Sequence, residues 1–101
     1  MTQLLDSAEI DTALAALPGW ERDGNSIRAR FTAPDFPTAI GLVDAVAIEA
    51  EARNHHPDID VRWREVLFVL STHSAGGVTS QDVALAGAIS AQAARLAVTT
   101  N

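Results

Sequence analysis

The sequence predicts an α+β fold, a two-layer sandwich in which three helices cover one face of a four-stranded antiparallel sheet. Segments with apolar residues at helical spacing are separated by paired segments in which apolar and polar residues alternate. Their order is helix, strand, strand, helix, strand, strand, helix. The chain has 101 residues, 48% of them apolar, so we expect one domain over residues 1–101 with a modest core.

The first helix is expected to begin at Asp6 or Ser7, because either side chain can accept a hydrogen bond from the first helical turn. Three apolar residues at helical spacing predict its buried face: Ile10, Leu14 and Leu17. Pro18-Gly19 then ends the helix.

The first hairpin is predicted around Asp23-Gly24-Asn25, since these residues accept a positive φ at little cost. The strand that follows alternates between two faces. Arg28 and Arg30 lie on the polar face, and the apolar face consists of Ile27, Ala29 and Phe31. This alternation is typical of a sheet with one face on the core.

The second helix is predicted to begin at Asp35, with Pro37 in its first turn, where a missing N–H costs little. Its buried face is predicted from steps of three and four: Phe36, Ile40, Val43, Ala47 and Ala50. Pro57 disfavours the α conformation at His56, so the helix should end near Asn54, a residue that tolerates left-handed backbone.

The second hairpin is predicted from a further alternating segment, in which Ile59, Val61 and Trp63 face the opposite side from Asp58, Asp60 and Arg62. Arg64-Glu65 is the expected turn. The strand that follows, residues 66–70, is apolar on both faces. One face would pack on the helices, and we expect a second subunit to cover the other.

The last helix is predicted to begin at Thr79, which forms a capping box with Asp82. Its buried stripe is expected to contain Leu85, Ile89 and Leu96. Asp82 lies three residues before Leu85 and therefore belongs to the end of that inward face.

Composition excludes several classes of function. The formal charge of −6 argues against a nucleic-acid partner or an anionic membrane surface, because both require a basic patch. The absence of cysteine excludes a disulfide, a thiolate nucleophile and a cysteine-based zinc site. We find no basic leader and no apolar run long enough to span a bilayer, so a cytoplasmic protein is expected.

All three histidines lie between Glu51 and Asp82, on both sides of the second hairpin. The antiparallel pairing should bring His73, at the end of one strand, back beside His55 and His56 at the start of the other. If Glu51 and His55 share the last helical turn, the carboxylate can hold one ring nitrogen and fix the tautomer. An ordinary imidazole pKa of about 6.5 suits acid and base roles near neutrality.

Other readings of these residues are open. Single histidines are usually structural or solvated, Asp82 alone would be a helix cap, and Glu51 alone a solvated side chain. Zinc is a sharper alternative, but adjacent histidines on an extended segment point apart and no familiar zinc spacing is present. No phosphate-binding loop accompanies Gly76-Gly77, and the serines near His73 lack a nucleophile elbow.

These residues together resemble the pterin-4a-carbinolamine dehydratase family, also known as the dimerization cofactor of a hepatocyte transcription factor. The resemblance is carried by Glu51, His55-His56-Pro57, Trp63, Ser71-Thr72-His73, Gly77-Val78-Thr79, Asp82 and Leu85-Ala86. It covers nearly the whole chain. It implies a hydro-lyase, 4a-hydroxytetrahydrobiopterin dehydratase, which removes water from the 4a-carbinolamine during tetrahydropterin recycling and needs no cofactor or metal.

The resemblance also implies roles for individual residues. His55 and His73 match the acid/base histidines, His56 matches one that holds the pterin, and Glu51 and Asp82 match the orienting carboxylates. Substrate contacts are expected from His55, His56, Pro57, Thr72, His73, Ser74 and Ala75. The residues themselves indicate Trp20 and Trp63 as core or rim side chains first, and either could also wall a pocket for a flat ring. The family also implies a homodimer or homotetramer.

The sequence departs from the family pattern at the rim of this motif. Asn54 stands where an acidic residue is common, and Arg64-Glu65 replaces an Asn-Lys-like turn. No aromatic residue follows Pro57 closely. These departures bear on substrate affinity and assembly more than on the reaction type. The alternative function is a non-catalytic oligomerisation or assembly partner on the same fold.

Overall fold

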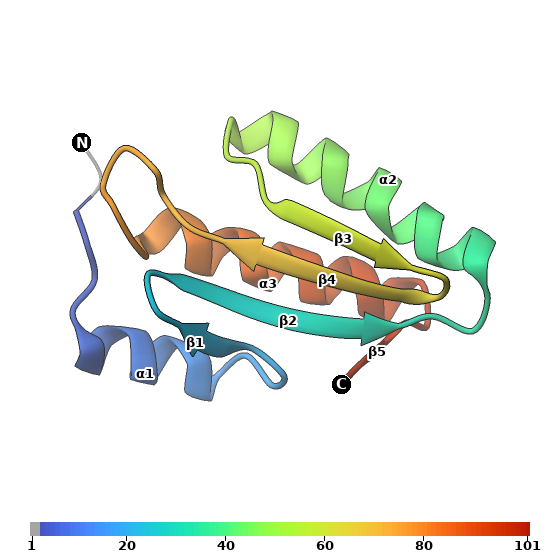
Figure 1. Cartoon of the computed structure of the whole chain (residues 1–101), viewed down its shortest axis with the longest axis horizontal. Helices are drawn as coiled ribbons and strands as arrows, with labels where there is room; N and C mark the ends of the chain where they lie inside the picture. The colour runs from blue at the N-terminus through green and yellow to red at the C-terminus, as the bar shows by residue number, and fades with distance from the viewer. Residues whose placement is uncertain (1–2) are drawn as a thin grey trace.

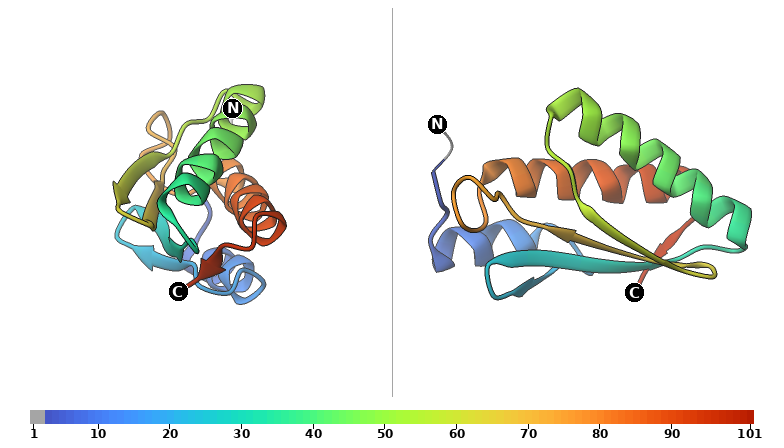
Figure 2. Two further views of the ribbon diagram at one scale, coloured as in Figure 1. Left: turned by 90° about the vertical axis from the view of Figure 1, so that its right-hand side faces the viewer. Right: turned by 45° about the horizontal axis from the view of Figure 1, so that its top comes forward.

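The computed structural model describes residues 3–101 and confirms the α+β architecture (Figure 1). The elements, in chain order, are α1 (Ser7–Ala15), β1 (Glu21–Asp23), β2 (Ser26–Thr32), α2 (Phe36–Arg53), β3 (Asp58–Arg62), β4 (Glu65–Leu70), α3 (Ser80–Arg95) and β5 (Thr99–Thr100). The helices lie on one side of the sheet (Figure 2). Within the described residues, no helix combines the length and the apolarity needed to cross a membrane.

The sheet is antiparallel throughout and has the order β1-β2-β4-β3. A fifth strand, β5, pairs with the end of β2, so the prediction of four strands was short by one. Two residues are too few to show any alternation in the sequence, which explains why β5 was missed. In the described part of the chain β3 pairs only with β4, and it therefore forms one edge of the sheet.

The core lies between the sheet and the helices, where the alternation predicted for β2 is confirmed. Phe31 of β2 and Phe68 of β4 are fully buried and meet edge to face, with ring centroids 5.7 Å apart. Trp20 packs on Phe31 in the same manner at 6.2 Å. Leu85 and Ile89 of α3 are fully buried against these residues, as their spacing predicted.

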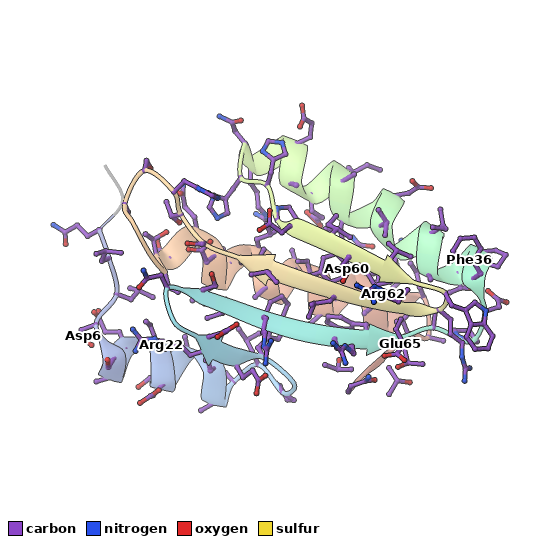
Figure 3. The ribbon with its side chains drawn as sticks, viewed as in Figure 1. Asp6, Arg22, Phe36, Asp60, Arg62 and Glu65 are labelled. Atoms are coloured by element: carbon purple, nitrogen blue, oxygen red, sulfur yellow. The ribbon has the colours of Figure 1, made fainter. Side chains whose placement is uncertain are left out.

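The buried face of α2 differs from the predicted one. Its buried residues are Ala39, Leu42, Val46 and Ala50, so the prediction holds for Ala50 but is wrong for Phe36, Ile40 and Ala47. Phe36 is 48% exposed at the start of the helix (Figure 3), and Ile40 is 37% exposed. The helix is apolar on two neighbouring faces, and helical spacing alone does not say which face meets the sheet.

The turn between β3 and β4 is Trp63-Arg64, one residue earlier than predicted, because Glu65 already pairs with Arg62. Trp63 has a φ of 55°, which is unusual for a bulky residue, and it is 74% exposed. The Arg64 guanidinium lies 5.3 Å from the centre of the Trp63 ring. This turn lies at the end of the hairpin opposite the start of β3 (Figure 1).

The outer face of the sheet is charged around a small apolar centre. Leu67 and Val69 of β4 are half-buried there, and the register places Arg28, Arg30, Asp58 and Asp60 beside them. Asp60, Arg62 and Glu65 lie on this face in Figure 3. The prediction that β4 presents apolar side chains on both faces is therefore confirmed, and its cover by a second subunit stays a prediction.

Candidate active site

A pocket of about 490 Å³ lies where α2 ends, β3 begins, β4 ends and the loop to α3 turns back. These four segments converge at one end of the sheet (Figure 1). The pocket is lined by Asn54, His55, His56, Pro57, Asp58, Ser71, Thr72, His73, Ser74 and Gln81. The structure thus brings all three histidines to one cavity, as the hairpin argument required.

The end of α2 decides where the two adjacent histidines point. Asn54 adopts the left-handed conformation predicted for it, with a φ of 49°, and the His55 N–H donates to Ala50 O at 3.0 Å. Pro57 then keeps the chain extended. His55 is consequently 8% exposed, with its ring directed inward, whereas His56 is exposed.

His55 pairs with Asp82, and not with Glu51 as the sequence suggested. The distance from His55 Nε2 to Asp82 Oδ1 is 2.6 Å, and the Asp82 side chain is fully buried. The expectation for Glu51 assumed that the helix continues to His55. The helix ends at Arg53, and the left-handed Asn54 turns His55 away from the face that carries Glu51.

Glu51 pairs instead with His56, through a contact of 2.7 Å between Oε2 and Nε2. Both side chains are exposed, at 80% and 57% respectively. Glu51 therefore orients His56, the histidine expected to bind the ligand, and not His55, which is expected to transfer protons. Neither Glu51 nor Asp82 lines the pocket itself, since each stands behind the histidine with which it pairs.

Asp82 occupies the third position of α3, where it completes the capping box predicted with Thr79. Its Oδ2 accepts the Thr79 N–H at 2.8 Å and the Thr72 hydroxyl at 2.7 Å. With His55 on Oδ1, the carboxylate has three polar partners in a fully buried position. Such partners are what a buried charged group requires.

His73 lies on the exposed loop between β4 and α3, and the loop is held by its own backbone. The Thr72 carbonyl accepts the N–H groups of Ala75 and Gly76, at 3.0 and 2.9 Å, while the Thr72 N–H donates to Gly77 O at 2.9 Å. The His73 side chain has no hydrogen-bond partner among residues 3–101, so both its ring nitrogens remain available to a ligand.

The N-terminal segment fastens this loop from the outside. The Leu5 N–H donates to Val78 O at 2.9 Å, and Leu4 bridges to Thr79. A side chain at Gly77 would begin 3.0 Å from the Leu4 side chain, so glycine permits the close approach. The position of His73 therefore depends on residues at the other end of the sequence.

Some residues predicted to contact a substrate lie elsewhere. Trp20 is in the core, where its Nε1–H donates to Ser90 Oγ at 2.9 Å, and it does not reach the pocket. Trp63 lies at the far turn of the hairpin, outside the pocket of its own chain. Ala75 belongs to the loop but is not among the lining residues.

Four lining residues were not predicted as site residues: Asn54, Asp58, Ser71 and Gln81. Asn54 and Asp58 directly flank the His55-His56-Pro57 segment, and Gln81 directly precedes Asp82. Their position next to the motif residues is the one feature of the sequence that could have identified these three as lining residues. The sequence presents Ser71 as a nucleophile candidate and as part of the family motif but not as a lining residue, and its hydroxyl donates to Asn25 O at 2.9 Å.

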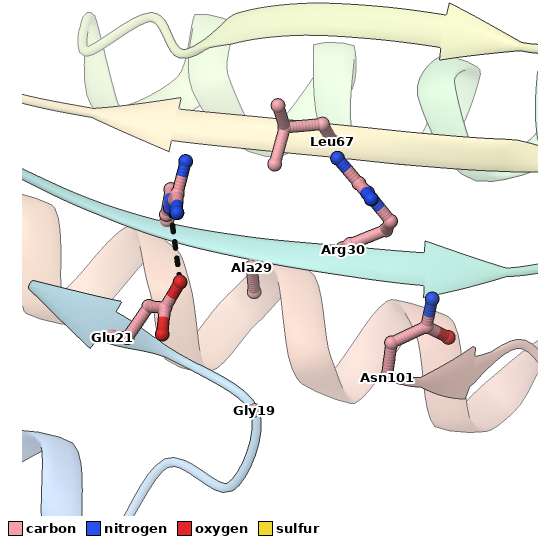
Figure 4. Close-up of a pocket in the computed structure, with 7 residues that line it drawn as sticks. Gly19, Glu21, Ala29, Arg30, Leu67 and Asn101 are labelled. Atoms are coloured by element: carbon pink, nitrogen blue, oxygen red, sulfur yellow. Dashed lines mark hydrogen bonds and ion pairs between the residues drawn. The ribbon is translucent and has the colours of Figure 1, made fainter. Parts of the chain in front are cut away.

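A second hollow, of about 270 Å³, lies on the outer face of the sheet (Figure 4). Arg28 and Arg30 line it, but Arg28 pairs with Glu21 at 3.0 Å, and Arg30 lies 3.9 Å from Glu65. The hollow contains no histidine and no buried ionisable group. The histidine pocket is therefore the candidate active site.

The histidine pocket is suited to moving protons. Among residues 3–101, no group of three or more histidine, aspartate and glutamate side chains is arranged to hold a metal ion. The two histidine–carboxylate pairs face different ways, as expected for adjacent histidines on an extended segment. What the pocket does offer is one buried, oriented imidazole and one free imidazole around a cavity, which is an arrangement for acid/base chemistry.

Comparison with known proteins gives a consistent result. The family model described as "Pterin 4 alpha carbinolamine dehydratase" matches residues 3–92. A protein of Roseiflexus castenholzii named "Putative pterin-4-alpha-carbinolamine dehydratase" is 55% identical over 89 residues, which are 88% of this chain and 96% of the relative. A protein of Nocardia farcinica with the same name is 56% identical over 85 residues, 84% of this chain and 90% of the relative.

A solved structure agrees with these relatives. The crystal structure of a transcriptional coactivator/pterin dehydratase from Brucella melitensis superposes with a TM-score of 0.86 at 36% sequence identity. The match covers 88% of this chain and 97% of the Brucella chain. Family and fold are therefore shared over nearly the whole length of both proteins.

Proposed function

The chain belongs to the pterin-4a-carbinolamine dehydratase family, and we propose that it removes water from a 4a-hydroxytetrahydropterin to give the quinonoid dihydropterin. The observation that carries the proposal is the His55–Asp82 pair. It places a buried, oriented imidazole in the same pocket as a second imidazole that has no partner in the described chain. The sequence relatives and the Brucella structure support the same reaction class.

The reaction needs two proton transfers and no redox step. One group protonates the hydroxyl on C4a, so that the C4a–O bond breaks and water leaves. Another group removes the proton from N5, and the electrons of that N–H bond form the N5=C4a double bond. Two positioned acid/base side chains are sufficient, so we propose a hydro-lyase without a cofactor or metal.

We assign these transfers to His55 and His73, which meet in the pocket from α2 and from the β4–α3 loop. His55 keeps one nitrogen on Asp82, so its chemistry takes place at the other nitrogen. His73 is free to turn toward a bound ring. We also assign His56, held by Glu51, to binding of the pterin, with Pro57 and Ser74 as further contacts.

We propose that the protein works as a cytoplasmic homodimer or homotetramer in tetrahydropterin recycling. The large apolar side chains Phe36, Ile40 and Ile48 are exposed on α2, and β3 is an edge strand among the described residues. Exposed apolar stripes and open strand edges are surfaces that other subunits cover. The non-catalytic assembly module remains the alternative function, and these surfaces are compatible with it.

The test follows the dehydration of freshly generated 4a-hydroxytetrahydropterin by absorbance. The parent should accelerate the spontaneous reaction, and H55A and H73A should each lose roughly 10²-fold or more of the rate. T12V, on the exposed face of α1 and away from the pocket, serves as the control and should retain full activity. Addition of a chelator should change nothing.

Two outcomes would overturn the proposal. If a folded, oligomeric parent does not exceed the spontaneous rate, the non-catalytic assembly module becomes the preferred function. If the rate falls with chelator, the pocket works through a metal. Loss of activity in T12V comparable to that in H55A would show that the assay reports folding rather than the site.

A further inference from the structure

Two buried threonines lie beneath the histidine pocket, and the proposed reaction gives their hydroxyls no role. Thr79 is fully buried and Thr72 is 4% exposed. Their hydroxyl oxygens are 2.7 Å apart, and Thr72 Oγ1 also lies 2.7 Å from Asp82 Oδ2. The three side chains form one continuous hydrogen-bonded chain that ends at His55.

The direction of each hydrogen bond in this chain can be worked out. A hydroxyl has one hydrogen to donate, and a carboxylate only accepts. Thr72 therefore donates to Asp82 Oδ2, which leaves it only an acceptor for Thr79. Thr79 must donate to Thr72, and its own oxygen accepts the Gln81 N–H at 3.2 Å. The order is Thr79 to Thr72 to Asp82.

The same donors decide how the carboxylate of Asp82 is used. Thr72 and the Thr79 N–H both donate to Oδ2, at 2.7 and 2.8 Å. The other oxygen, Oδ1, is left facing His55 Nε2 as an acceptor at 2.6 Å. His55 must then carry its proton on Nε2. Every buried side-chain nitrogen and oxygen in residues 3–101 has a partner, so the unpartnered Nδ1 retains contact with the pocket.

We propose that Thr72 and Thr79 are positioning residues that hold the Asp82 carboxylate with Oδ1 toward His55. The carboxylate sets the Nε2–H tautomer, and His55 therefore exchanges protons with the substrate through Nδ1. Thr72 serves the site from behind, because its hydroxyl has no hydrogen left for a ligand. Proton exchange through Nδ1 rests on the proposed dehydration. The assignment of the proton to Nε2 rests on the geometry alone.

The decisive variant is D82N. The two donors on the Oδ2 side require an acceptor, so the asparagine carbonyl oxygen must take that position and the NH₂ group must face His55. Nε2 then has to accept, and the proton moves to Nδ1. Nitrogen-15 NMR of the imidazole ring, recorded across a pH titration, identifies the protonated nitrogen in the parent and in D82N without any assay of activity.

The threonine itself is tested by T72V, with T72S as the conservative variant and T12V as the control. Thr12 carries an exposed hydroxyl on α1 that donates to Ala8 O, so T12V removes one hydroxyl far from the pocket. T72V leaves Oδ2 with one donor, so the carboxylate is held less firmly, but it still accepts from Nε2–H and the NMR spectrum should keep that tautomer. T72S should restore the second donor, and T12V should not differ from the parent.

Kinetics separate positioning from direct contact. T72V should lower kcat roughly 10- to 100-fold with little change in KM, and T72S should recover most of it. D82N should lower kcat by roughly 10²–10⁴-fold, since it presents the wrong tautomer. T72V that raises KM with kcat unchanged would show that the hydroxyl contacts the substrate, and it would overturn the proposal.

The two halves fail in different ways. A parent in which His55 is protonated on Nδ1, or a D82N variant that keeps the proton on Nε2, would refute tautomer selection whatever the activity. If T72V is unstable, the D82N spectrum still decides that point. Tautomers as expected in a protein without dehydratase activity would leave the geometry correct and the proposed function wrong.

Discussion

The two histidine–carboxylate pairs at the end of α2 differ in everything except distance. His55 and Asp82 are 2.6 Å apart, and His56 and Glu51 are 2.7 Å apart. The first pair is enclosed, with side-chain exposures of 10% and 0%, and its carboxylate also accepts from two threonines. The second pair has exposures of 57% and 80% and no further partner in the described chain.

The comparison shows that burial, and not distance, determines how much stability is lost when one member of a pair is removed. An exposed pair competes with water and salt and loses side-chain freedom, so its net stabilisation is about 0–1 kcal/mol. A buried pair contributes little net stability when intact, yet removal of one partner strands the other without a hydrogen bond. Equal distances therefore predict very unequal consequences of mutation.

The largest effect is expected from D82A compared with E51A. D82A leaves His55, Thr72 and the Thr79 N–H without their acceptor in a buried position, and it should lower the free energy of unfolding by about 3–5 kcal/mol. E51A should change it by about 0.5 kcal/mol or less. Urea denaturation measures both. Equal losses in the two variants would show that burial does not distinguish the pairs.

A double-mutant cycle on His56 and Glu51 should give a smaller effect. The variants H56Q, E51Q and the double mutant should report a coupling of about 0.5 kcal/mol at low salt, which disappears near 1 M salt because the pair is exposed. Denaturation at two salt concentrations provides the measurement. A coupling above about 2 kcal/mol that persists at high salt would mean that this pair is enclosed, most simply by another subunit.

The smallest effect concerns a third carboxylate, which is exposed but hydrogen-bonded. The Thr38 hydroxyl and N–H hold the pKa of Asp35 below its usual value, with the N–H at 2.8 Å. A lowered folded-state pKa means that this stabilisation is present above the unfolded pKa of about 3.9 and is lost as the pH falls through the folded one.

The variant D35N keeps a neutral cap and tests that sign. The parent should be more stable than D35N near neutral pH, and the difference should shrink as the pH is lowered past about 4 toward 2. Thermal unfolding across this range follows the difference. A gap that widens in acid would contradict the assigned direction of the pKa shift.

The sequence was sufficient for the architecture because most local signals agreed. Caps at Asp6 and Thr79, the turn at Gly24-Asn25 and the left-handed Asn54 all appear where the residues predicted them. Alternation in β2 assigned the core face of that strand, whereas β4 is apolar on both faces and gave no such signal. These signals act within a few residues, so they can be read without the rest of the molecule.

The errors arose where the answer depends on the tertiary structure. α2 is apolar on two faces, and only the packing of the sheet and α3 selects Ala39, Leu42 and Val46 over Phe36 and Ile40. Helical spacing paired Glu51 with His55. The left-handed conformation of Asn54 was predicted, but not that it would turn the His55 side chain away from Glu51. Trp20 was expected in the core or at the rim before any role as a pocket wall, and the structure places it in the core.

The contacts that join Leu4 and Leu5 to the loop carrying His73 also have a consequence for folding. The hydrogen bond from Leu5 to Val78 joins residues that are separated by most of the chain, whereas each hairpin closes locally. Contacts between distant residues form late, since the intervening chain must first lose its freedom. Leu5 is synthesised long before Val78, so this closure of the histidine loop becomes possible only shortly before the core contacts that α3 makes with the sheet.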